Sequence, residues 1–205
     1  MTKLGLDFDN TLIHYDNLFH KLATEKGLIS SSVASNKIAI RDFLRKNKKD
    51  KEFTLLQGEV YGKKILEAEP AKDVVKTLKA LQQKGISLVV VSHKTKTPYK
   101  GPAYDLHRAA VSWFEKHKFF SKDGLGWEYS QIYFEKTKEE KIAKIKALGC
   151  THYVDDLPEI IKALPESLKG ILYDPKNIYE GHTGPKIEKW NEIETVINKE
   201  NTHAT

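Results

Sequence analysis

Residues 4–16 read LGLDFDNTLIHYD, an apolar run that leads directly into two aspartates, Asp7 and Asp9. Side chains two residues apart on a strand point to the same side. The two carboxylates therefore repel each other unless a cation or a reaction compensates for them. An apolar strand that ends in paired acids near the start of a chain indicates that chemistry takes place at the strand's carboxyl end.

Four further apolar runs predict strands, and one of them, ISLVVV, is apolar on both faces, which is typical of a parallel sheet covered by helices. Helical stretches alternate with these runs. The pattern predicts an α/β fold with an open, three-layer, Rossmann-like parallel sheet. The expected strands are Leu4–Phe8, Ile86–Val91, Gln131–Phe134, His152–Val154 and Gly170–Tyr173.

Two helices have recognisable ends. Residues 69–85, EPAKDVVKTLKALQQKG, place Pro70 near the start of a helix and Gly85 just after its end. Residues 137–149, TKEEKIAKIKALG, begin with a capping box from Thr137 to Glu140 and stop at a glycine. The glycine-rich residues 181–186, GHTGPK, lack the strand–loop–helix context of a phosphate cradle and are interpreted as a turn.

The connection from the first strand to the second is too long for a single crossover. We therefore expect a core formed by residues 1–14 and 70–205, with a mainly helical cap inserted over residues 15–69. The insert contains a basic run, LRKNKKDKEF, which is interpreted as a solvated loop between helices. A second long connection, from about residue 93 to residue 130, follows the second strand.

Composition narrows the class of protein. The chain has 205 residues, a net charge of +6 and a single cysteine, Cys150, so an internal disulfide framework is excluded. The first expected strand begins too early to leave room for a signal peptide, and no apolar run approaches membrane-spanning length. We expect a cytoplasmic protein that handles anions and does not enter a membrane. Nucleic acid also fits the basic charge but is not favoured.

Polar side chains follow three of the expected strands: Asp7 and Asp9 the first, Ser92 the second, Asp155 and Asp156 the fourth. In doubly wound sheets, ligands bind at the carboxyl ends of the strands. If these strands are neighbours, four carboxylates and a hydroxyl meet in one place, and this requires positive charge. Ligands that are all oxygen, without clustered histidine or cysteine, favour Mg²⁺ over Zn²⁺.

Such a site suits phosphoryl transfer. An aspartate can attack phosphorus and form an acyl phosphate, and a second carboxylate can protonate the leaving oxygen and then activate water. A serine hydroxyl and a lysine would offset the charge on the phosphoryl oxygens. Lys141, in the helix before the fourth strand, is the first choice for this lysine, and Lys138 is the second.

DFDNT, a serine directly after LVVV, a lysine near a helix start and VDD after a later strand resemble, in this order, the four motifs of the haloacid dehalogenase (HAD) superfamily. The resemblance spans about residues 4–175. It implies a sheet of order 5-4-1-2-3, with Asp7 as nucleophile and Asp9 as general acid and base. It also implies that Ser92 and Lys141 bind the phosphoryl group. The implied Mg²⁺ ligands are Asp7, Asp155, Asp156 and the backbone carbonyl of Asp9.

Asp9 separates the reactions within this family. The resemblance implies that dehalogenases lack the second aspartate, because a halide leaves without a proton. We therefore expect a Mg²⁺-dependent phosphomonoester hydrolase that acts on a small metabolite, such as a sugar phosphate or a nucleotide. The alternatives are a phosphatase of nucleic-acid ends and a non-catalytic binding module. Expected substrate-binding residues are Asn10, Thr11, His93 and Lys94, and the same loop offers Lys96, Tyr99, Lys100 and Arg108.

Overall fold

The computed structural model describes residues 2–202 and groups them into two compact units. The first unit contains residues 2–12, 70–93 and 118–202, and the second contains residues 13–69 and 94–117. Within the described residues, no helix is long and apolar enough to cross a membrane. The first unit holds all the strand ends that carry candidate catalytic acids.

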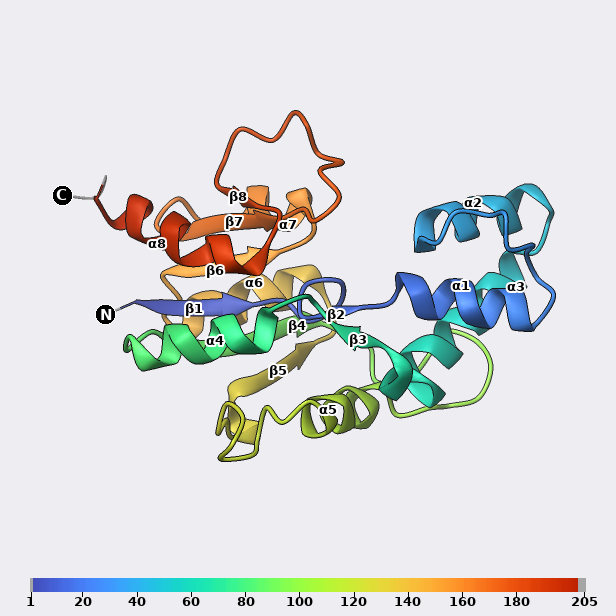
Figure 1. Cartoon of the computed structure of the whole chain (residues 1–205), viewed down its shortest axis with the longest axis horizontal. Coiled ribbons are helices and arrows are strands. Elements are labelled where there is room, and N and C mark those ends of the chain that lie inside the picture. The colour runs from blue at the N-terminus through green and yellow to red at the C-terminus, as the bar shows by residue number, and fades with distance from the viewer. Residues whose placement is uncertain (1, 203–205) are drawn as a thin grey trace. The chain divides into compact units, whose positions relative to one another are not determined.

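A six-stranded parallel sheet of order β5-β4-β1-β6-β7-β8 forms the centre of the first unit (Figure 1). Numbered as the five strands expected from the sequence, its first five strands have the order 5-4-1-2-3 when read from the β7 side, which confirms the prediction. The strands are β1 (Lys3–Leu6), β4 (Ser87–His93), β5 (Ile132–Glu135), β6 (His152–Asp155), β7 (Lys169–Tyr173) and β8 (Lys186–Ile187).

The edge strand β8 was not predicted. The glycine-rich segment interpreted as a turn is irregular up to Pro185, but its last residue, Lys186, pairs with Leu172 of β7. A strand of two residues is too short to show a periodic pattern, so only the three-dimensional fold reveals it.

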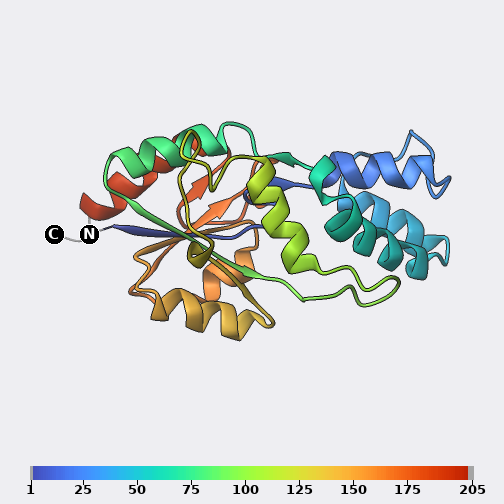
Figure 2. The ribbon, with the colours of Figure 1, turned by 90° about the horizontal axis from the view of Figure 1, so that it is seen from below.

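Helices cover both faces of the sheet, as a parallel sheet requires. Figures 1 and 2 show α4 (Val74–Gln83) and α8 (Ile193–Thr202) on one face and α6 (Lys138–Ala147) and α7 (Pro158–Ala163) on the other. The predicted capping box begins α6: the Thr137 side chain accepts from the Glu140 N–H at 3.1 Å, and the Glu140 carboxylate accepts from the Thr137 N–H at 3.1 Å. This box fixes where the helix starts.

The second unit is mainly helical. It contains α1 (Asp16–Glu25), α2 (Lys37–Lys46), α3 (Asp50–Gly58) and α5 (Leu106–Lys116), with a π-helical turn at Glu59–Lys63 after α3. β2 (Ile13–His14) and β3 (Glu69–Pro70) form a separate two-stranded sheet.

Residues 94–117 group with this second unit, whereas the sequence analysis left them in the core. Two contacts explain the difference. The Trp113 indole N–H donates to the Ala68 carbonyl at 2.8 Å, and a side chain at Gly62 would meet the Tyr104 Cβ at 2.6 Å. Segments far apart in sequence thus pack closely, which no local pattern predicts.

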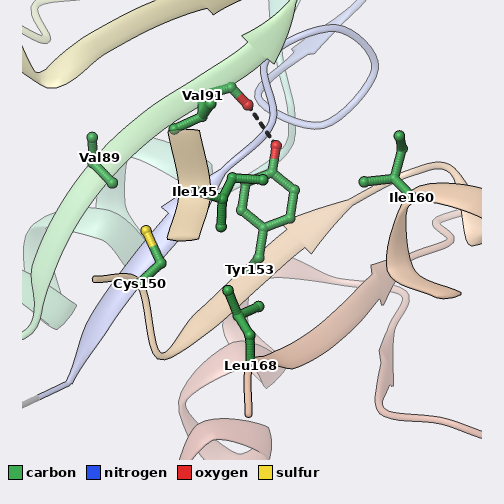
Figure 3. Close-up of a cluster of buried hydrophobic side chains, with 7 residues drawn as sticks. All are labelled: Val89, Val91, Ile145, Cys150, Tyr153, Ile160 and Leu168. Carbon is green, nitrogen blue, oxygen red and sulfur yellow. Dashed lines mark hydrogen bonds between the residues drawn. The ribbon is translucent and has the colours of Figure 1, made fainter. Parts of the chain in front are cut away.

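The core between the sheet and α6 and α7 is built around Tyr153 of β6 (Figure 3). Its ring is fully buried, and its hydroxyl donates to the Val91 carbonyl of β4 at 2.5 Å. Between these two strands lies β1, where Gly5 is paired with Tyr153 on one side and with Val89 on the other. A Cβ at Gly5 would lie 2.6 Å from Cδ2 of Tyr153, so the glycine makes room for the ring.

We expect Gly5→Ala to destabilise the protein by about 1–3 kcal/mol, because a methyl group in this packed core forces the ring or the strand to move. Urea denaturation measures the loss. Gly181→Ala is the control, since a Cβ there has no atom within 4 Å and its φ is not positive. The double variant with Tyr153→Leu should lose less than the sum of the two single variants. Full additivity would contradict the close packing of Gly5 against Tyr153.

Candidate active site

Asp7 directly follows β1 and is nearly fully buried. Its N–H donates to the Val154 carbonyl of β6 at 2.9 Å, which holds the residue at the edge of the sheet. The chain then turns through Asn10, whose φ of 60° lies in the left-handed region that asparagine tolerates better than most residues. The turn brings Thr11 back, so that its hydroxyl donates to Oδ2 of Asp7 at 3.3 Å.

Two donors meet the other oxygen of Asp7. The Ser92 hydroxyl, on β4, donates to Oδ1 at 2.9 Å, and the Lys141 ammonium, on α6, donates to the same atom at 2.6 Å. Lys141 also donates to Oδ2 of Asp155 at 2.6 Å. Three segments predicted separately from the sequence therefore converge on one carboxylate. A buried aspartate with these partners is held in one orientation.

The structure distinguishes the two candidate lysines. Lys141 is buried and contacts both Asp7 and Asp155, whereas Lys138 is about half exposed and forms an ion pair with Glu159. Both lie at the start of α6, but only Lys141 lies four residues before the buried Ile145, on the side of the helix that packs against the sheet.

Asp7, Asp155 and Asp156 can each offer a carboxylate oxygen, and these oxygens lie within 4.8 Å of one another. The Lys141 ammonium neutralises one of the three negative charges, so two remain, which is the charge of one divalent cation. The donor set is all oxygen, as Mg²⁺ prefers. The site residues therefore fit a hard divalent cation.

The electrostatics support the same conclusion. Burial, and then the charge of Asp7, raise the pKa of Asp155 to about 7, although Lys141 and the Leu157 N–H act to lower it. Burial and the charges of Asp7 and Asp155 also raise the pKa of Asp156 well above its ordinary value. Burial alone would lower the pKa of Lys141, but Asp7 and Asp155 outweigh it and raise the pKa. The raised pKa values of Asp155 and Asp156 mean that the three carboxyl groups do not all ionise readily together unless further positive charge is supplied.

Asp155 is the last residue of β6, and its Oδ1 accepts from the N–H of Leu157, the residue before α7, at 2.9 Å. Its other oxygen, Oδ2, accepts from Lys141, so the two contacts together fix the orientation of the Asp155 carboxylate.

Three other predicted residues are not among those that contact Asp7 or form the three-carboxylate group. The side chain of Asp9, which is half-buried, is not part of the three-carboxylate group found among residues 2–202. A His93 ring nitrogen lies 2.9 Å from the Lys136 carbonyl, at the entry to α6. Lys94 belongs to the second unit, where its ammonium lies 5.3 Å from the ring centroid of Tyr61. Catalysis by Asp9 and substrate binding by His93 and Lys94 stay predictions.

Tyr153, which the sequence analysis overlooked, lies next to Lys141 of the site. Its ring centroid is 5.5 Å from the Lys141 ammonium nitrogen. One signal could have pointed to it: a glycine in the middle of the apolar strand LGL, where a side chain would normally pack, indicates that a bulky neighbour crosses the strand.

An open parallel sheet of this order, with acids at the carboxyl ends of β1 and β6, a serine near the end of β4 and a buried lysine on α6, defines a class of α/β fold. Solved structures of the HAD superfamily share it. A HAD hydrolase of family IA from Entamoeba histolytica is 16% identical and aligns over 97% of this chain and 98% of its own, with a TM-score of 0.57. The chain therefore has the HAD-superfamily fold.

Two further structures show the range of activities on this fold. A predicted phosphoglycolate phosphatase from Haemophilus somnus is 16% identical over 96% of this chain and 98% of its own, with a TM-score of 0.57. A dehalogenase is 13% identical over 94% and 95%, with a TM-score of 0.55. No protein-family model and no curated protein matches the sequence. At these identities the likeness concerns the fold, and the reaction has to be argued from the site.

Proposed function

We propose that the protein is a Mg²⁺-dependent phosphomonoester hydrolase that acts on a small phosphorylated metabolite through an aspartyl-phosphate intermediate. One observation carries the proposal: the Asp7 carboxylate is oriented by Ser92 and Lys141 and lies within a group of three acids with two uncompensated charges. A nucleophile held among phosphate-binding donors and beside a cation site has the parts that phosphoryl transfer needs.

In the first step, an oxygen of Asp7 forms a bond to phosphorus while the ester P–O bond breaks. Asp9 gives its proton to the leaving alkoxide. In the second step, Asp9 takes a proton from water, whose oxygen attacks phosphorus, releases inorganic phosphate and restores the Asp7 carboxylate. Ser92 and Lys141 donate to the phosphoryl oxygens in both steps and offset their charge.

Asp7, Asp155 and Asp156 would hold Mg²⁺, together with the backbone carbonyl of Asp9. The ion supplies positive charge that offsets the phosphoryl oxygens and the carboxylates. The Lys141 ammonium offsets only one of the three carboxylate charges. Without the ion, no positive charge of this group is left to offset a bound phosphate.

Asp9 favours a phosphatase over a dehalogenase. An alkoxide leaving group needs a proton and a halide does not, so an acid two residues after the nucleophile is useful only for the ester. The direct test compares two assays. The first measures hydrolysis of p-nitrophenyl phosphate, once with Mg²⁺ and once with excess EDTA, and the second measures chloride release from a 2-chloro acid. Hydrolysis that depends on Mg²⁺, without chloride release, is expected. Chloride release without ester hydrolysis would overturn the proposal.

We expect Asp9→Asn to lower steady-state turnover of p-nitrophenyl phosphate about 100-fold but to leave a burst of p-nitrophenolate, up to one per protein. This leaving group departs without a proton, whereas hydrolysis of the aspartyl phosphate still needs a base. Stopped-flow absorbance measures the burst, and Asp16→Asn in the second unit is the matched control. A slow reaction without any burst would argue against two-step chemistry.

The distribution of charge supports a second candidate, a phosphatase of nucleic-acid ends. Residues 37–51 contain seven lysines and arginines and two aspartates, so this segment carries a net charge of +5 out of +6 for the chain. Turnover of a 5′-phosphorylated oligonucleotide that falls steeply with salt would favour this candidate. Turnover of small phosphomonoesters with little dependence on salt would favour the first.

A further inference from the structure

The Tyr153 side chain connects three of the segments that build the site. It starts on β6, two residues before Asp155, passes over Gly5 of β1 and ends at the Val91 carbonyl of β4 (Figure 3). Val91 directly precedes Ser92, whose hydroxyl donates to Asp7. The phenol therefore ties the end of β4 to β6 across the central strand.

The ring of the same tyrosine faces the Lys141 ammonium, with 5.5 Å between the nitrogen and the ring centroid. This distance is within the range of a cation–π interaction, and such interactions are strongest where water is excluded. Lys141 and Tyr153 are both buried. The ammonium is thus surrounded by two carboxylates, at 2.6 Å each, and by one aromatic ring.

We infer that Tyr153 is a positioning residue that holds the Lys141 ammonium and the end of β4 in place for phosphoryl binding. The inference rests on the proposed function for the identity of the group bound there. A lysine side chain has four rotatable bonds, and each conformation outside the site weakens its contact with the transferring group. The ring limits the positions open to the ammonium, and the hydroxyl, bonded to the Val91 carbonyl, keeps the ring itself in one place.

The competing explanation is that Tyr153 only fills the core. Its neighbours in the apolar cluster include Val89, Val91 and Ile145, so loss of the ring would destabilise the protein under either explanation. A measurement of stability alone cannot separate them. The test must report on Lys141 itself and on the step in which Lys141 takes part.

The first test is NMR of protein labelled with ¹³C in lysine, with the Lys141 signal assigned through Lys141→Arg. The ring current of Tyr153 should shift the Lys141 ε-CH₂ protons upfield of the other lysines. The shift should persist in Tyr153→Phe and disappear in Tyr153→Leu. Lys141 protons without an upfield shift in the unsubstituted protein would overturn the inference, even if Tyr153→Leu failed to fold.

The second test compares kcat and KM for p-nitrophenyl phosphate with Mg²⁺. We expect Tyr153→Leu to lower kcat about tenfold. Tyr153→Phe should lower kcat about threefold or less, because it keeps the ring that faces Lys141 and loses only the hydroxyl that fixes the ring to the end of β4. Val89→Ala, in the same cluster, should lose stability but keep its kcat. Equal losses of kcat in Tyr153→Leu and Val89→Ala would show a structural role only. If the unsubstituted protein hydrolyses no phosphomonoester, the proposed function fails, while the NMR result still decides the role of Tyr153.

Discussion

Asp7→Asn should abolish Mg²⁺-dependent hydrolysis of p-nitrophenyl phosphate, with a fall in kcat of about 10⁴-fold or more. The amide is a poor nucleophile, and within residues 2–202 Asp7 is the one carboxylate that accepts from both Ser92 and Lys141. The variant should fold, because the amide oxygen can still accept from both donors. Steady-state kinetics at saturating Mg²⁺ measure the loss, and circular dichroism checks the fold.

The matched control is Asp123→Asn in the same unit. Asp123 is exposed and pairs with Lys118 at 2.7 Å, so the substitution removes the same charge without touching the site. We expect it to keep full activity. If a folded Asp7→Asn variant kept its full Mg²⁺-dependent turnover, the covalent mechanism would be excluded. Asp7 would then have no role as a nucleophile.

Much of the site could be predicted because its residues lie at the carboxyl ends of strands. The direction of a strand and a position at or just after its end are enough to place Asp7, Ser92 and Asp155 at one edge of a parallel sheet. The resemblance to the HAD motifs then supplied the strand order, which the structure confirms. Local sequence patterns were sufficient here because a parallel strand is a short, apolar and easily recognised element.

The sequence does not show which of the two candidate lysines faces the site. Lys138 and Lys141 both lie near the start of α6, and the side that a helical residue faces depends on the phase of the whole helix. The buried Ile145, four residues after Lys141, sets that phase in the structure. Because α6 carries charged residues over much of its surface, its buried side is only weakly marked in the sequence.

Contacts between segments that are far apart in the chain could not be predicted from the sequence. Tyr153 reaches Val91, which lies 62 residues away, and residues 94–117 group with an insert that ends before them. Both depend on a glycine that makes room for an aromatic side chain, Gly5 for Tyr153 and Gly62 for Tyr104. A glycine in the middle of a strand or helix reveals that something packs closely, but not which side chain does so.

Lys141→Met should both destabilise the protein and inactivate it. The substitution leaves Asp7 and Asp155 buried without their shared cation, and breaking a buried ion pair from one side costs about 3–5 kcal/mol. Loss of a preorganised donor to the phosphoryl oxygens should lower kcat about 10³-fold. Urea denaturation in EDTA measures the first effect, and turnover of p-nitrophenyl phosphate with Mg²⁺ measures the second.

Mg²⁺ should restore part of the lost stability, because a divalent cation between the carboxylates relieves the repulsion that the missing ammonium leaves behind. Addition of Mg²⁺ should therefore raise the melting temperature more in Lys141→Met than in the unsubstituted protein. Lys138→Met is the control, since Lys138 is exposed and its ion pair with Glu159 contributes about 1 kcal/mol or less. If Lys138→Met were inactive and Lys141→Met fully active, the assignment of the phosphate-binding lysine would be reversed. If Mg²⁺ raised the melting temperature equally in all three proteins, the cation would bind away from Asp7 and Asp155.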